Sequence, residues 1–203
     1  MQKPRQPWYS WYAAVAAVVG LPGAGSWSSV SPPWPDHDFA SGTYTPQVRS
    51  GINLSAYFVP DPHGHIGLYG RYLTGPSDMT VSGTDNHARV FASDWGLGVS
   101  LKLGGRPVDS LWLGGIFEVG GVSFRSDRND SAILEQSGFD GGIRLALDWI
   151  MTPPGGFRVG LTASAGFEFA MIYLDDDVRS DSDIQTTWDW LQPVVLVGVL
   201  FGG

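Results

Sequence analysis

Long stretches of this sequence alternate apolar with small or polar residues, and the few charged side chains at the alternate positions are the first candidates for chemistry. Paired carboxylates can act as general acid and base, and glycoside hydrolysis requires such a pair. Ion pairing explains the same residues more simply, because most of the acids have a base within reach. The two sets nearly balance, with Arg71, Lys102, Arg144 and Arg158 against Asp94, Glu118, Asp140, Asp148 and Glu168.

The short turns between these stretches set a register for the charges. The register places Arg144 opposite Glu118, Glu118 opposite Asp94, Asp94 near Arg71, and Asp148 opposite Arg158. Adjacent like charges destabilise a strand pair unless a counter-ion is close, so the flanking arginines would stabilise the two acids between them. We therefore predict an ion-pair network and no catalytic residue, with the members Arg71, Asp94, Glu118, Arg144, Asp148 and Arg158.

Composition excludes several classes of protein. The chain has 203 residues with 12 Lys and Arg against 20 Asp and Glu, a net charge of −8, and therefore lacks the basic stripe that nucleic-acid binding requires. The absence of cysteine excludes disulfides and thiolate metal sites. No apolar run approaches the roughly 18 residues of a transmembrane helix.

Strict alternation of bulky apolar and small or polar residues indicates strands. It continues without a break over residues 157–173, about three times the length of an ordinary strand. Short Pro, Gly and Asp turns alternate with longer polar segments, which is typical of a barrel that crosses the outer membrane. The predicted strands of the single domain 1–203 cover residues 8–20, 49–59, 65–74, 89–103, 110–125, 136–151, 156–173 and 187–202.

Residue size decides which face of the strands points inward. The polar face is rich in Gly, Ala and Ser, which suits the narrow interior of an eight-stranded barrel, whereas the apolar face is uniformly bulky. We therefore predict an all-β, eight-stranded antiparallel up-and-down transmembrane β-barrel whose ion-pair network closes the lumen. A soluble all-β barrel acting as a binding module is the alternative, although its wet exterior would carry more than the 2 Lys found here.

Strand parity bears on the N-terminal segment. Seven strands would leave an open edge in lipid, where unpaired backbone groups cost several kcal/mol each. Residues 8–20 are therefore predicted to form the first strand, which leaves both termini periplasmic and residues 21–48 as a long external loop. A cleaved signal peptide is the alternative for this segment, because Lys3 and Arg5 precede its apolar core.

The strand pattern and the C-terminus Val195-Leu196-Val197-Gly198-Val199-Leu200-Phe201 resemble the small bacterial outer-membrane barrels of the OmpA, OmpX and OmpW type. The segment Pro7-Trp8-Tyr9-Ser10-Trp11 is similar to an entry motif of small myxobacterial barrels. The resemblance implies an outer-membrane location, lipid and lipopolysaccharide as surroundings, and no cofactor. It also implies that Phe201 is the assembly signal recognised by the barrel-assembly machinery, although two glycines follow it here.

Histidine provides the alternative chemistry. The resembled family includes lipid-modifying enzymes with Ser and His near the outer leaflet, and His87, beside Asn86 and near Ser82, lies toward that rim. A single loop histidine is usually only solvated, so the prediction remains a protein that is not an enzyme. His63 and His65 flank a turn without further ligands, and no metal site is predicted.

The external segments supply the candidate binding surface. Trp27, Trp34 and Phe39 lie among prolines in the first loop and are predicted to contact a protein partner or to fold over the barrel mouth. A later loop is predicted to be a hydrated acidic segment, because the glycine spacing of a calcium loop is missing. Its acids are Asp175, Asp176, Asp177, Asp181 and Asp183. Trp188 and Trp190 are assigned to the outer aromatic girdle, and a bulge is expected at Gln192-Pro193.

Overall fold

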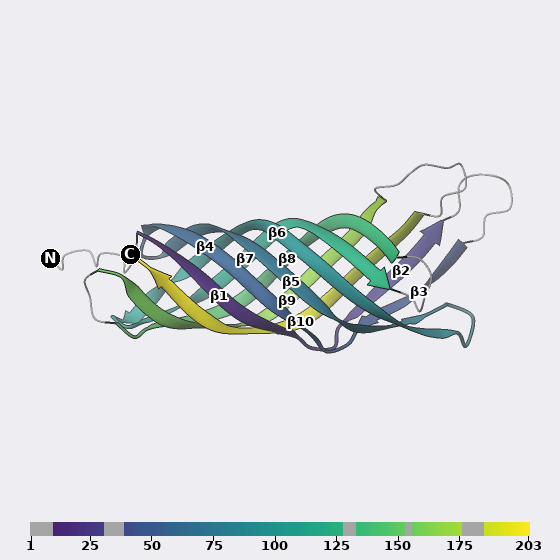
Figure 1. Cartoon of the computed structure of the whole chain (residues 1–203), viewed down its shortest axis with the longest axis horizontal. Coiled ribbons are helices and arrows are strands. Elements are labelled where there is room, and N and C mark those ends of the chain that lie inside the picture. The colour runs from purple at the N-terminus through teal and green to yellow at the C-terminus, as the bar shows by residue number, and fades with distance from the viewer. Residues whose placement is uncertain (1–9, 31–38, 128–132, 153–155, 176–184) are drawn as a thin grey trace.

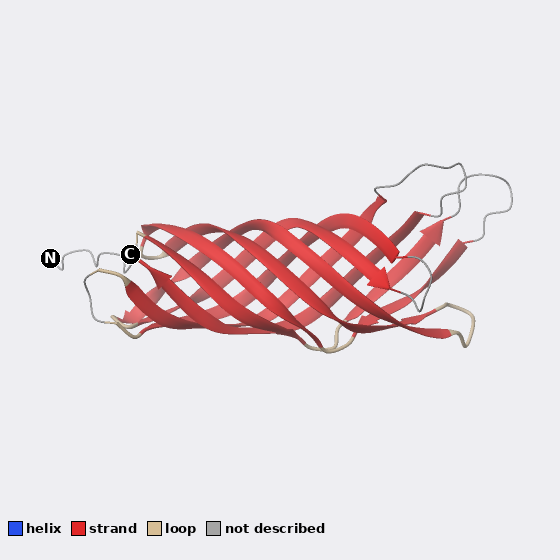
Figure 2. Cartoon of the chain, in the orientation of Figure 1, coloured by secondary structure: helices blue, strands red, loops and turns tan. Residues whose placement is uncertain are grey.

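The computed structural model describes residues 10–30, 39–127, 133–152, 156–175 and 185–203. These residues form one antiparallel sheet of ten strands that closes on itself into an elongated barrel (Figures 1 and 2). The described residues contain no helix that is long and apolar enough to cross a membrane.

The strands follow one another around the barrel in up-and-down order. Several are far longer than the mean strand of a soluble protein. Their bounds are β1 (Trp11–Gly20), β2 (Ala24–Val30), β3 (Phe39–Pro46), β4 (Arg49–Asp61), β5 (Gly64–Thr80), β6 (His87–Val108), β7 (Leu111–Asp127), β8 (Ile133–Ile150), β9 (Arg158–Asp175) and β10 (Gln185–Gly202).

Closure of the sheet confirms the predicted ring of eight strands. At the end of the barrel that holds the C-terminus, β1 pairs with β10 on one side and with β4 on the other (Figure 1). Toward the opposite end, β2 replaces β1 beside β10, and β3 replaces β4 beside β5. Residues 11–20, for which a signal peptide was the alternative, are therefore an integral strand of the barrel.

The prediction of a single external loop over residues 21–48 is wrong, because β2 and β3 occupy residues 24–30 and 39–46 of it. Trp27 and Tyr44 point inward from these strands, whereas Ser26 and Thr43 point outward. The alternation is present in the sequence, but its outward residues are polar. A search for bulky outward residues therefore misses strands whose outer face meets water.

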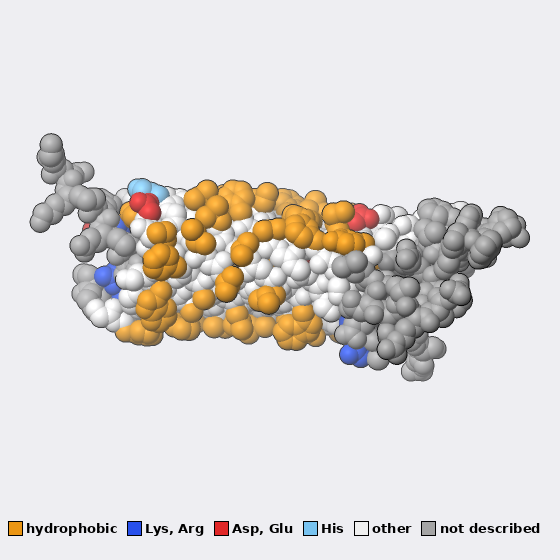
Figure 3. Space-filling view, turned by 90° about the horizontal axis from the view of Figure 1, so that it is seen from above, with side chains coloured by type: hydrophobic (Ala, Val, Ile, Leu, Met, Phe, Trp, Pro, Cys, Tyr) orange, Lys and Arg blue, Asp and Glu red, His pale blue; other side chains and the backbone are white. Residues whose placement is uncertain are grey.

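The two faces of the barrel wall have opposite character. Leu145 is 78% exposed and Phe167 54%, whereas Arg144 is 2% and Glu168 3% exposed. Apolar side chains form a belt around the barrel between charged groups at its two ends (Figure 3). This arrangement contradicts the soluble-barrel alternative, whose core would be apolar and whose surface would carry the charges.

Two strands of the eight-stranded ring are each interrupted near mid-length by a kink. One of them consists of β1 and β2, and the other of β3 and β4. β1 ends at Gly20 before β2 starts at Ala24, and β3 ends at Pro46 before β4 starts at Arg49. The bulge expected at Gln192-Pro193 is not on β10, which pairs with β9 in continuous register through both residues. The irregularity lies instead between β1 and β2, which pair with β10 on its other side, because Pro193 has no backbone N–H to donate to them.

The buried amide of Gln192 joins the two kinks. Its Nε2 donates to the carbonyl oxygen of Leu21 at 2.8 Å and to that of Gln47 at 3.1 Å. The Leu21 N–H in turn donates to the carbonyl oxygen of Pro193 at 2.8 Å. The backbone groups released by the kinks are thus satisfied inside the barrel.

Candidate functional site in the lumen

The middle of the lumen is occupied by a layer of paired charges, which we call the ion layer. It consists of Arg71, Glu118, Asp140, Arg144 and Glu168, all buried. Arg71 Nη2 lies 2.6 Å from Asp140 Oδ2, and its Nη1 lies 2.7 Å from Glu168 Oε1. Arg144 Nη1 lies 2.9 Å from the same Glu168 oxygen, and its Nη2 lies 2.5 Å from Glu118 Oε1. Two guanidinium groups therefore connect carboxylates that project from different strands.

Neighbouring inward residues complete the ion layer. The Tyr69 hydroxyl donates to Asp140 Oδ1 at 2.8 Å, so both oxygens of that carboxylate have a partner. Gly96 leaves room for the same carboxylate, because a Cβ added at Gly96 would lie 2.4 Å from Asp140 Oδ2. Small residues on the inward face are thus a steric requirement of the long charged side chains opposite them.

A separate buried pair lies outside the ion layer. Arg49 Nη2 is 2.7 Å from Asp94 Oδ2, and the same nitrogen donates to the carbonyl oxygen of Leu73 at 3.2 Å. Arg49 is the first residue of β4, immediately after the kink between β3 and β4. The pair therefore ties the start of this strand to β6 across the lumen.

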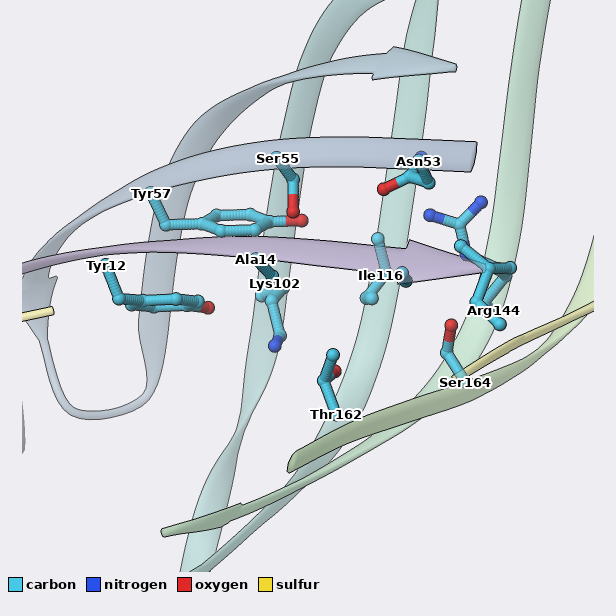
Figure 4. Close-up of a pocket in the computed structure, with 12 residues that line it drawn as sticks. Tyr12, Ala14, Asn53, Ser55, Tyr57, Lys102, Ile116, Arg144, Thr162 and Ser164 are labelled. Atoms are coloured by element: carbon cyan, nitrogen blue, oxygen red, sulfur yellow. The ribbon is translucent and has the colours of Figure 1, made fainter. Parts of the chain in front are cut away.

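Aromatic rings surround the lysine nearer the terminal end of the barrel. Lys102 Nζ lies 2.5 Å from Asp148 Oδ2, and Thr162 donates to the other oxygen of Asp148 at 2.8 Å. The same ammonium group is 4.6 Å from the ring centroid of Trp112 and 5.4 Å from those of Tyr12 and Tyr57, of which Figure 4 shows the two tyrosines. Cation–π attraction supplements the ion pair where water is scarce.

The opposite half of the lumen is apolar, which the sequence did not predict. Its aromatic cluster contains Trp27, Tyr44, Phe124, Trp188 and Trp190. The Trp190 ring centroid lies 5.4 Å from that of Tyr44 and 5.3 Å from that of Phe124. Polar atoms of the rings are paired, since Trp188 Nε1 donates to Gln136 Oε1 at 2.8 Å and Trp27 Nε1 to the carbonyl oxygen of Thr80 at 2.9 Å.

The predicted network is only partly assembled as expected. Arg71, Glu118 and Arg144 meet in the ion layer, and Arg144 contacts Glu118. The predicted register is wrong throughout. Arg144 lies opposite Ile116, Glu118 opposite Ser100, Asp94 opposite Phe124, Asp148 opposite Thr162 and Arg158 opposite Gly202. Asp94 pairs with Arg49 and Asp148 with Lys102, because the strands are strongly tilted and side chains reach across the lumen rather than along one row.

Several functional residues were missed or misplaced by sequence reasoning. Arg49 and Tyr69 were not recognised as inward, although Arg49 shares the parity of Asn53 on its own strand. Trp27 is 9% exposed and belongs to the aromatic cluster rather than to a contact surface. Trp188 and Trp190 likewise point into the lumen and are not girdle residues. Trp34 and the side chain of Phe39 lie outside the described residues.

The other candidate residues have plain structural positions. His87 is exposed at the start of β6, opposite Thr80. His65 Nδ1 shares a 3.0 Å hydrogen bond with the Tyr12 hydroxyl. Phe201 of β10 pairs with Val159 and Ala13, and its ring centroid is 6.4 Å from that of Phe157. Within the described part of the chain, no three His, Asp or Glu gather so as to hold a metal ion.

The acidic external loop is not described beyond the backbone of Asp175, so the interpretation of Asp176, Asp177, Asp181 and Asp183 stays a prediction. The same holds for the segment between β2 and β3.

A closed antiparallel barrel with an apolar outer belt and a charged lumen defines the class: by fold, this chain is an integral outer-membrane β-barrel. No family model matches the sequence, and no curated protein matches it. Its structure is similar to that of the outer membrane protein OprG from Pseudomonas aeruginosa, with a TM-score of 0.53 and 12% identity over 98% of this chain and 97% of that chain.

Weaker similarity links it to two other solved structures. The outer membrane protease OmpT from Escherichia coli gives a TM-score of 0.45 at 9% identity, covering 93% of this chain and 96% of that chain. Ail, the attachment invasion locus protein of Yersinia pestis, gives 0.38 at 9% identity, covering 93% and 99%. The similarity to OprG shows a shared fold, and none of these similarities transfers an activity.

Proposed function

We propose that this barrel is a non-conducting outer-membrane protein that acts as a structural or partner-binding element through its external end. The single observation that carries the proposal is the filling of the lumen at three successive levels. These levels are the Lys102 site, the ion layer and the aromatic cluster. Each fills the interior with side chains that contact one another.

The ion layer supports closure because its charges are satisfied by each other. A water-filled pore leaves charged side chains hydrated, whereas Arg71 and Arg144 each contact two or more carboxylates at short range. Moving an unpaired ion past such a layer would require separating buried pairs, which costs several kcal/mol. The same pairing speaks against acid–base catalysis there, since Glu118, Asp140 and Glu168 are 5% exposed or less.

The orientation proposed for the barrel follows from its two ends. The C-terminus, the two-residue turns 62–63 and 109–110 and the connection 151–157 lie at one end of the barrel. The strand ends that precede the other connections, all longer than two residues, lie at the other end (Figure 1). In outer-membrane barrels short turns face the periplasm, so both termini are proposed to be periplasmic and the longer connections external. Phe201, near the terminal end, is proposed as the assembly signal.

Conductance tests the closed lumen directly. Wild-type protein inserted in planar bilayers is expected to give no large stable pore, while a general porin in the same bilayers gives one. Slower gel mobility after boiling than before boiling shows that the inserted protein is folded. A large and stable conductance from folded protein would contradict the proposal.

Partner binding through the external end has its own test. Protein that copurifies from native membranes is expected to be lost when residues 81–86, at the tip of the β5–β6 hairpin, are replaced by Gly and Ser. The control replaces the same number of residues around the 62–63 turn at the other end. If the partner were lost only in the control variant, binding would lie at the end that holds the C-terminus, and the proposal would be contradicted.

A further inference from the structure

A small cavity lies in the lumen between the ion layer and the Lys102 site. Its volume is about 30 Å³, which is enough for one small ion or one or two water molecules. Inward residues of seven strands line it, and Figure 4 shows Asn53, Arg144 and Ser164 around one end of it with Lys102 and Thr162 further along. The cavity is separate from the contacts that hold the ion layer together.

Two donors in this lining have no acceptor. Asn53 is 4% exposed, and its amide nitrogen Nδ2 meets no hydrogen-bond partner among the described residues. The same is true of Arg144 Nε, although the other two guanidinium nitrogens of Arg144 contact Glu118 and Glu168. A buried donor without an acceptor costs about 1–3 kcal/mol, so both groups favour an acceptor in the cavity.

The charge of the lining selects the kind of acceptor. It includes the cations Lys102 and Arg144 and the hydroxyl groups of Ser55, Thr162 and Ser164, but no Asp or Glu. Lys and Arg are donors only, and each hydroxyl can donate one hydrogen. The carboxylates that pair with the two cations lie outside the lining, so the lining has an excess of unpaired N–H donors over anionic acceptors.

From this donor excess we infer that the cavity binds a small monovalent anion of the size of chloride. Asn53 Nδ2 and Arg144 Nε supply two N–H groups, and the hydroxyl groups of Ser55 and Ser164 turn their hydrogens toward the ion. A cation is disfavoured because Lys102 and Arg144 both adjoin the space.

Bromide gives a direct test, because it replaces chloride and scatters X-rays anomalously. Crystals of the full chain soaked in bromide are expected to show one anomalous peak between Asn53 and Ser164, and crystals of Asn53→Leu are expected to lack it. Wild-type crystals in which this cavity holds only water density, while bromide peaks appear elsewhere on the surface, would overturn the inference.

A solution measurement gives an independent readout. The urea unfolding equilibrium of the detergent-solubilised protein is compared in chloride and in gluconate at the same ionic strength. At chloride tenfold above its dissociation constant the unfolding constant should fall about elevenfold, and the dependence should saturate. Asn53→Leu should abolish the dependence, whereas the matched control Asn86→Leu, in an exposed turn, should retain it.

A chloride effect of equal size in wild type and Asn53→Leu would contradict the site, since salt would then act elsewhere. This inference is separable from the closed lumen. A conducting wild-type barrel would contradict the proposed function and leave the bromide peak in place, whereas a missing bromide peak would remove the anion site and leave the conductance result unchanged.

Discussion

Replacing Arg71 by Met is the sharpest test of the ion layer. Arg71 is the residue that contacts all three carboxylates of the layer, at 2.6 Å from Asp140, 2.7 Å from Glu168 and 3.7 Å from Glu118. Methionine keeps an unbranched, flexible side chain, although a shorter one, and removes the charge. Glu118 and Glu168 retain Arg144, whereas Asp140 retains only the Tyr69 hydroxyl.

The expected loss of stability follows from that uncompensated carboxylate. Removing one partner of a buried ion pair costs about 3–5 kcal/mol, because the other charge stays away from water. A matched control is Arg89→Met, since Arg89 pairs with Asp78 at 3.6 Å on the outside of the barrel with side chains 70% and 49% exposed. Exposed pairs contribute about 0–1 kcal/mol, so the control should unfold almost as the wild type does.

The assay is urea unfolding of the protein in lipid vesicles, followed by tryptophan fluorescence. Adding Asp140→Asn to Arg71→Met removes the stranded charge and should recover about 0.5–3 kcal/mol relative to the sum of the single losses. The reasoning is refuted if Arg71→Met and Arg89→Met lose the same amount, or if the two lumen substitutions are additive.

Three further outcomes follow from the same structure and are measured by the same unfolding assay. Gly96→Ala should lose about 1–3 kcal/mol because its methyl would lie 2.4 Å from a carboxylate oxygen, whereas Gly70→Ala, whose nearest side chain would be 3.8 Å away, should be nearly neutral. Gln192→Leu should lose about 1–3 kcal/mol for each of the two kink carbonyls that it leaves unpaired, and an unchanged midpoint would show that water replaces the amide. Leu145→Arg in the apolar belt should lose about 2–4 kcal/mol, while Thr187→Arg, which points outward near the end opposite the C-terminus, should stay within about 0.5 kcal/mol; equal losses would contradict the placement of the belt.

The fold could be predicted from the sequence because lipid imposes a simple rule on it. The outward residues of a membrane strand must be mostly apolar, and this rule predicted the outward positions of Leu145 and Phe167. The turns could also be predicted, since Pro, Gly and Asp at short spacing indicate hairpins. The ring of strands and the inward face followed from these two signals.

The pairing of the inward charges could not be predicted in the same way. Register between adjacent strands places Asp148 opposite Thr162, but its charged partner Lys102 lies on β6, two strands away from β8. A narrow lumen lets long side chains choose among several strands, and the choice depends on tilt and on which positions are glycine. Gly96 is an example, because its missing side chain opens the space that Asp140 fills.

The aromatic cluster was missed because the two faces of the wall exchange character along the barrel. On β10 the outward residues change from Thr187 and Asp189 to Leu191, while the inward residues change from Trp188 and Trp190 to Gln192. Beside water the apolar side chains must point inward, and beside lipid they must point outward, so the exchange marks where the belt ends. Gln192 lies at this level and also joins the two kinks. The kinks therefore lie at the level where the outer face of the wall changes from lipid-facing to water-facing. On the lipid side of this level the bulky residues point outward, and on the water side they point inward.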